Sequence, residues 1–130
     1  MIEPGKSAAS PNRKAILILG MHRSGTSAVA GVAHALGAAG PRSLMAPDEF
    51  NPRGYFESSV LSVAFDEMLA SLGSSWHEWR GLSLRSLSSD AAEQHRAKIK
   101  ALIRAEFGDQ PLIFVKDPRI CRFVPLQPPF

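Results

Sequence analysis

The sequence predicts an α/β protein whose strands form a parallel sheet. Two short apolar runs support this class, Ala15 to Leu19 and Leu112 to Val115, because each has the length and composition of a strand buried on both faces. Three segments between them repeat apolar residues at helical spacing, and each ends at a glycine. A chain of 130 residues has room for one domain at most, which we place at residues 14–130.

Residues 1–13 are expected to form a disordered leader, because they are polar and carry Pro4, Gly5 and Pro11. They lack the long apolar core of a signal peptide, and no apolar run approaches the length of a membrane span. The net charge of +3 favours anionic ligands only weakly, and the basic residues are too scattered for a nucleic-acid surface. The single cysteine, Cys121, excludes an internal disulfide, so we expect a cytoplasmic protein. The histidines are too far apart to predict a metal site.

The first strand leads into a glycine loop that has the character of an anion site. Gly20 and Gly25 are separated by four residues, and the apolar residues that follow Ser27 have helical spacing. Loop N–H groups and the helix dipole then favour negative charge at the start of this helix. The glycine spacing matches a phosphate-binding loop, but Thr26 occupies the place of the usual lysine. Arg23 is the nearest cation, and its planar group suits phosphate or sulfate oxygens.

The first helix is expected to pack closely on the sheet through its alanines and Gly31, and to end at Gly37. A long loop follows, residues 41–58, whose Asn51-Pro52-Arg53-Gly54 sequence favours a type I turn. Long loops in compact domains tend to be functional, and this one can fold back over the glycine loop. Its last charged residue, Glu57, is either a surface glutamate or a functional carboxylate.

Two more helices are expected before the second strand. The first starts near Ser58 and buries a face of apolar residues, and the second opens with the capping-box pattern of Asp90 to Glu93. Between them, Trp76 and Trp79 are interpreted as closing the edge of the core. The alternative is an aromatic wall that binds a sugar or an aryl group. His77 between them is an alternative candidate base.

The second strand ends in Lys116-Asp117-Pro118-Arg119. Charged groups at the carboxyl end of a buried parallel strand are where open α/β sheets bind ligands. Asp117 could hold magnesium, as in a nucleotide hydrolase or kinase. Alternatively, Lys116 points at a transferred group while Asp117 makes a local turn. The second interpretation is favoured because the glycine loop lacks its lysine. Arg119 is either a further anion contact or a charge at a helix start.

Three blocks resemble the sulfotransferase family. The run from Gly20 to Ser27 resembles its 5′-phosphosulfate-binding loop, in which a basic residue followed by Ser-Gly-Thr replaces the lysine motif. The run from Asn51 to Glu57 resembles a block of bacterial-type sulfotransferase domains, and Lys116-Asp117-Pro118 resembles a third block. The resemblance implies a three-layer P-loop-type fold and transfer of a sulfuryl group from 3′-phosphoadenosine 5′-phosphosulfate to a hydroxyl acceptor, a carbohydrate or another alcohol, with no metal required.

The resemblance also implies roles for individual residues. Glu57 is a candidate general base, and Lys116 steadies the bridging oxygen of the leaving phosphosulfate. Arg23 contacts the negative charge of the phosphosulfate. The donor is then held by the loop residues His22, Arg23, Ser24, Gly25, Thr26 and Ser27.

The resemblance covers about residues 14 to 124, the N-terminal half or so of a full sulfotransferase domain. The block that carries an arginine and a serine for the donor 3′-phosphate is missing, so the fold is expected to be incomplete at its C-terminus. An incomplete sheet exposes an edge, which predicts self-association. Two alternatives remain: a truncated sulfotransferase remnant without activity, and a P-loop small-molecule kinase that uses magnesium and Asp117.

Overall fold

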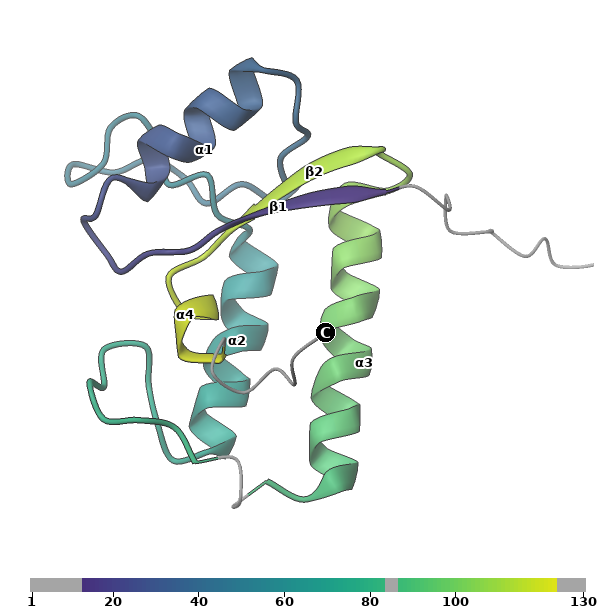
Figure 1. Ribbon diagram of the computed structural model, residues 1–130. Coiled ribbons are helices and arrows are strands. Elements are labelled where there is room, and N and C mark those ends of the chain that lie inside the picture. Colours follow the sequence, from purple (N-terminus) through teal and green to yellow (C-terminus); the bar gives the residue numbers. More distant parts are fainter. Residues whose placement is uncertain (1–12, 84–86, 124–130) are drawn as a thin grey trace, which may run out of the picture.

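The computed structural model describes residues 13–83 and 87–123, which form a mixed α/β fold (Figure 1). The elements in chain order are β1 (Lys14–Ile18), α1 (Thr26–Ala35), α2 (Ser59–Ser71), α3 (Ser89–Phe107), β2 (Leu112–Lys116) and α4 (Ile120–Phe123). The expected leader lies outside the described residues except for Arg13. Arg13 donates hydrogen bonds to the carbonyls of Gly108 and Gln110, which join it to the described fold.

The two strands pair in parallel, from Lys14 beside Leu112 to Ile18 beside Lys116. On the other edge of β2, the Ala39 N–H donates to the Leu112 carbonyl at 2.9 Å and the Phe114 N–H donates to the Ala39 carbonyl at 3.0 Å. Backbone therefore borders β2 on both edges. No described residue pairs with the outer edge of β1.

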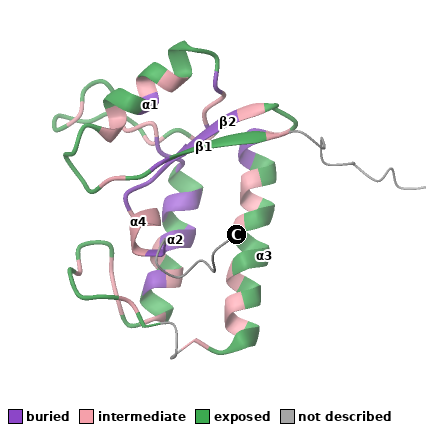
Figure 2. Ribbon diagram, in the orientation of Figure 1, coloured by how far each residue is buried: buried purple, intermediate pink, exposed green. Residues whose placement is uncertain are grey.

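The lack of a described partner at the outer edge of β1 explains why the burial prediction for the first strand is wrong. The sequence predicts that β1 is buried on both faces, but most of it is exposed, with Leu17 at 57% (Figure 2). The prediction holds for β2, where Ile113, Phe114 and Val115 are all buried. An apolar composition shows that a strand can be buried, whereas actual burial requires a neighbouring strand or helix on each side.

Helices lie on both faces of the sheet. On one face, Ile18 and Phe114 pack with Ala30 of α1 and with Ala38. On the other face, the alternate residues of β2 pack with α2, α3 and α4 (Figure 1). The buried residues of this second cluster are Leu61, Phe65, Leu69, Phe107, Ile113, Val115 and Phe123. Side chains that alternate across β2 thus build a core on each face.

α1 contacts the sheet through its small residues, as expected. Ala30 is fully buried, and a Cβ placed on Gly31 would lie 3.5 Å from the Phe56 ring. The larger side chains of this helix, Val29 and Val32, are exposed together with Leu36 just beyond it. Close approach of the helix to Phe114 and Phe56 leaves room only for alanine and glycine, so the bulky residues face away from the sheet.

The other two long helices begin and end close to their predicted limits. Ser58 caps α2 by accepting a hydrogen bond from the Leu61 N–H at 3.1 Å. α3 begins two residues earlier than the capping-box pattern predicts, because Ser88 accepts from the Ala91 N–H at 3.2 Å. No helix among the described residues is both long and apolar enough to cross a membrane.

Candidate functional site

The glycine loop between β1 and α1 has an unusual backbone. A Cβ on Gly20 would lie 2.5 Å from Thr26 Cγ2 and 2.8 Å from Ser24 Oγ, so only glycine fits there. Gly25 is the N-cap residue of α1 with φ of 84°, and Arg23 adopts φ of 61°, which is rare for a residue with a side chain. The chain therefore accepts backbone strain inside this loop, as functional loops often do.

The N-terminus of α1 is open to an anion. No side chain caps it, and its first turn holds no acidic residue. The first N–H groups of a helix have no partner inside the helix, and the helix dipole adds positive potential at this end. One loop amide is already engaged, because the Gly20 N–H donates to Cys121 Sγ at 3.0 Å. Any anion therefore contacts the later amides of the loop and the start of α1.

A buried ion pair lies beside the loop. Lys116, the last residue of β2, places its Nζ 2.5 Å from Glu57 Oε1, and the two side chains are only 5% exposed. The same Nζ donates to Ser27 Oγ at 3.3 Å. Ser27 belongs to the first turn of α1, so the structure brings together residues from three separate parts of the sequence. The predicted residues Glu57, Lys116 and Ser27 do meet at one point.

Burial changes the acid–base behaviour of two side chains here. Desolvation raises the pKa of Glu57 above its ordinary value, and the hydrogen bond and charge of Lys116 oppose this shift only in part. Desolvation lowers the pKa of His22, and the positive charges of Arg119 and Lys116 lower it further. Near neutral pH the site therefore holds a neutral imidazole beside cations, and a carboxylate that accepts a proton more readily than an exposed glutamate.

The structure assigns Arg119 to a network of acidic groups. Its Nε donates to Asp66 Oδ1 at 2.7 Å, and its Nη1 donates to Asp117 Oδ1 at 3.1 Å and lies 3.9 Å from Glu57 Oε2. Ser62 donates to the other oxygen of Asp117 at 2.7 Å. Asp117 is thus buried with both oxygens hydrogen-bonded. The sequence left the role of Arg119 open. Asp66 lies 53 residues before Arg119, so no local sequence pattern indicates that they bond to each other.

A cavity of about 560 Å³ opens beside the ion pair. Its lining includes most of the predicted loop residues, the ion pair and several aromatic side chains, namely His22, Arg23, Gly25, Thr26, Ser27, Phe50, Asn51, Tyr55, Glu57, Trp76, Lys116 and Pro118. The predicted donor residue Ser24 does not line it. Its hydroxyl donates instead to the Met21 carbonyl at 2.5 Å, which braces the loop from within.

The two tryptophans differ from the sequence interpretation. Trp79 is 84% exposed, with the Arg80 guanidinium carbon 5.6 Å from its ring centroid, so it does not close the core. Trp76 lines the cavity, with its ring centroid 4.4 Å from that of His22. His77 does not line the cavity and contacts the Ser75 hydroxyl at 3.4 Å. The structure thus places His22 and Trp76 at the site and leaves the alternative base outside it.

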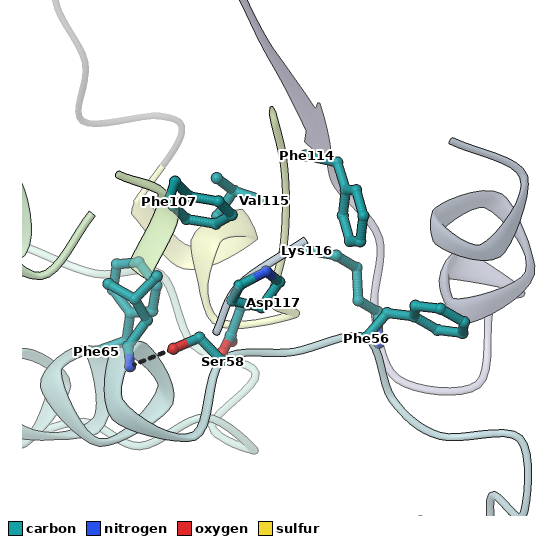
Figure 3. Close-up of a pocket in the computed structure, with 10 residues that line it drawn as sticks. Phe56, Ser58, Phe65, Phe107, Phe114, Val115, Lys116 and Asp117 are labelled. Carbon is teal, nitrogen blue, oxygen red and sulfur yellow. Dashed lines mark hydrogen bonds between the residues drawn. The ribbon is translucent and has the colours of Figure 1, made fainter. Parts of the chain in front are cut away.

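Behind the ion pair is a second, much smaller space of about 10 Å³ (Figure 3). Its lining is largely apolar, and Figure 3 shows Lys116 at its edge near Phe56 and Phe114. Such surroundings strengthen electrostatic interactions, because few water molecules can screen them. The charged ends of Lys116 and Glu57 therefore lie between an apolar interior and the open cavity.

Among the described residues, no group of three or more acidic, histidine or cysteine side chains has the geometry to hold a metal ion. The arrangement brings an uncapped helix N-terminus, a lysine and a carboxylate of raised pKa into one cavity. No protein-family model, curated protein or solved structure matches this chain, so the function has to be inferred from the geometry of the site itself.

Proposed function

We propose that the chain is a sulfotransferase with a P-loop-type three-layer fold, which moves a sulfuryl group from 3′-phosphoadenosine 5′-phosphosulfate to a hydroxyl acceptor. The observation that carries this proposal is the contact of Lys116 with both Glu57 and Ser27. It brings the end of a strand, a carboxylate and the start of an anion-binding helix to one place. The sequence resemblance and the α/β arrangement agree with it.

In this proposal the chain positions its substrates and stabilises charge. The loop amides, Arg23 and the hydroxyls of Thr26 and Ser27 hold the 5′-phosphosulfate. Glu57 takes the proton of the acceptor hydroxyl as the acceptor oxygen forms its bond to sulfur. The bond from sulfur to the bridging phosphate oxygen breaks, and Lys116 stabilises the negative charge that this oxygen gains. The products are the sulfate ester and 3′-phosphoadenosine 5′-phosphate.

Replacing Arg23 with alanine tests the donor site. The loss of a charge-assisted hydrogen bond is expected to weaken binding of 3′-phosphoadenosine 5′-phosphate by about 10- to 100-fold, as measured by calorimetric titration. Arg53→Ala is the control, because Arg53 is an exposed arginine of the neighbouring loop. Equal affinity in the two variants would show that Arg23 does not contact the donor.

Two alternatives give different results in that titration. A kinase would prefer ATP with magnesium and would use Asp117, but Ser62 and Arg119 already occupy both oxygens of Asp117. A remnant without activity would fold cooperatively and bind neither nucleotide. The assembled ion pair of Lys116 and Glu57 favours the active enzyme over the remnant.

We also propose that two copies of the chain pair along β1, in the cytoplasm, where the single cysteine stays reduced. The outer edge of β1 exposes backbone groups, Leu17 and Ile16, and such an edge is best covered by another strand. Two β1 strands related by a two-fold axis run antiparallel. This arrangement places the only charged residue of the strand, Lys14, at opposite ends of the pair.

The substitution Leu17→Lys tests this pairing. Sedimentation should show a dimer for the unmodified chain and a monomer for Leu17→Lys, because an edge lysine opposes strand addition. Val63→Lys is the control, since Val63 is an equally exposed apolar residue on α2. A monomer in both the unmodified chain and the control would refute the pairing.

A further inference from the structure

Glu106 is a buried acid that the proposed chemistry does not use. It lies at the end of α3 and is 5% exposed. Its carboxylate accepts hydrogen bonds from the Ser43 N–H at 3.2 Å, the Ser43 hydroxyl at 2.9 Å and the Ser58 hydroxyl at 2.6 Å. Within residues 13–83 and 87–123, it forms no ion pair with a lysine, arginine or histidine. Three donors from two separate segments thus take the place of a cation.

These two segments are the ends of the long loop that carries Glu57. The Met45 N–H donates to the Glu57 carbonyl at 2.8 Å, and the Ser59 N–H donates to the Ser43 carbonyl at 2.8 Å. Leu44 and Ser58 form an antiparallel bridge between these bonds. The bonds therefore close the loop at a neck, residues 43–45 and 57–59, and Glu106 joins the two sides of this neck.

The backbone next to this neck is strained. Phe56 directly precedes Glu57 and has φ of 57°, and Arg23 is the only other non-glycine residue with positive φ in the described chain. A bulky residue keeps such a conformation only where neighbouring contacts hold it there. The Phe56 ring packs near the Phe114 ring, with 6.4 Å between the centroids. The neck fixes the backbone on the other side of Phe56, from Glu57 onward.

We propose that Glu106 is a positioning residue for Glu57. Glu106 holds the neck of the long loop, so that the Glu57 carboxylate stays buried against Lys116. The inference rests on the proposed function, in which Glu57 is the base. Its structural part, that Glu106 fixes Glu57, is separate from that function and is measured separately. Ser58 connects the two, because its hydroxyl bonds to Glu106 while its backbone follows Glu57 directly.

The test replaces Glu106 with glutamine. The amide is nearly isosteric, but only its oxygen accepts, so the bond that the Ser43 hydroxyl donates to the second carboxylate oxygen is lost together with the charge that strengthens all three bonds. Hydrogen exchange of the Met45 and Ser59 amides should accelerate by about tenfold or more as the neck opens locally. The pKa of Glu57, followed by carbon-13 NMR of its carboxyl, should fall toward the ordinary glutamate value as water reaches it. The charged groups that face Glu57, namely Lys116, Arg119 and Asp117, are unchanged in this variant.

The activity readout is the transfer of the sulfuryl group to water, measured as sulfate released from the donor. Glu106→Gln should lower the maximal rate by about 10- to 100-fold, because small displacements of a catalytic group cost that much. Binding of 3′-phosphoadenosine 5′-phosphate should not change, since Glu106 makes no contact with the glycine loop. Glu93→Gln is the matched control, because Glu93 is an exposed glutamate of the same helix.

Ser43→Ala is a milder variant in case Glu106→Gln does not fold. It removes one donor to Glu106 and should change the same readouts in the same direction, by less. If exchange at the neck and the Glu57 titration match those of the Glu93→Gln control, the proposal is wrong. If both respond while the unmodified chain releases no sulfate, Glu106 does position Glu57, and the proposed transferase activity is what fails.

Discussion

Glu57→Gln should lower the rate of sulfuryl transfer by about 100- to 10,000-fold, the usual contribution of a positioned general base. The substitution keeps the size of the side chain and removes both its capacity to take a proton and its negative charge beside Lys116. The rate is measured as the formation of 3′-phosphoadenosine 5′-phosphate from the donor, with an alcohol or water as the acceptor. Affinity for the same nucleotide should be retained, because Glu57 carries no contact to the glycine loop.

The pH dependence provides a second measurement of this role. Burial raises the pKa of Glu57, so the fraction of ionised base, and with it the rate, should rise with pH through a midpoint above the ordinary glutamate value of about 4.3. Glu57→Gln should remove this acid limb from the profile. Glu49→Gln is the control, because Glu49 is an exposed glutamate of the same loop. A profile with its acid limb intact in Glu57→Gln would assign the base to another residue.

Lys116→Met should lower the rate of transfer by about 100- to 1,000-fold, comparable to the loss of one preorganised donor that stabilises developing charge. Methionine keeps the apolar stem, which lies near Phe56 and Phe114, and removes the ammonium group. Single-turnover kinetics with saturating donor measure the effect on the chemical step. Lys98→Met is the control, since Lys98 forms an exposed ion pair with Glu67 far from the cavity.

The Lys116 variant also distinguishes a kinase from a sulfotransferase. A kinase would depend on Asp117 and magnesium more than on Lys116, so Asp117→Asn would then be the variant that abolishes activity. For the sulfotransferase, Asp117→Asn acts through stability, because Asp117 accepts hydrogen bonds from Ser62 and Arg119.

Both principal substitutions break a buried ion pair, so their effects on stability have to be separated from those on the rate. Removing one partner leaves the other charge buried without a counter-ion, which typically costs about 3–5 kcal/mol of unfolding free energy. The double variant Glu57→Gln with Lys116→Met removes both charges and should recover part of that loss. It should remain as inactive as the worse single variant. Recovery of stability without recovery of rate would assign the catalytic loss to chemistry.

Local patterns in the sequence were sufficient to predict the order and type of the main elements. Apolar spacing and glycine ends located α2 and α3, and the glycine loop was placed correctly between β1 and α1. The family resemblance implied that Glu57 and Lys116 belong to one site, but their direct contact was not predicted. Nothing in the spacing of these residues shows that they contact one another.

Features that depend on neighbours distant in sequence could not be predicted. The exposure of Leu17 depends on which strands flank β1, and the outward direction of Val29 depends on how closely α1 approaches Phe56 and Phe114. Asp66 gave no sign of function, because a single acidic residue on an amphipathic helix normally faces water. Its bond to Arg119 follows from the packing of α2 beside the end of β2.

Because the Gly20 N–H donates to Cys121 Sγ, the glycine loop cannot be transferred to another protein with all of its hydrogen bonds intact. Its first amide finds its acceptor 101 residues further along the chain, in α4. A strand, loop and helix transplanted to another scaffold would carry that amide without its sulfur, and the entry to the loop would be free to bond elsewhere. Engineering of the glycine loop therefore has to move α4 together with it, as one unit assembled from both ends of the described fold.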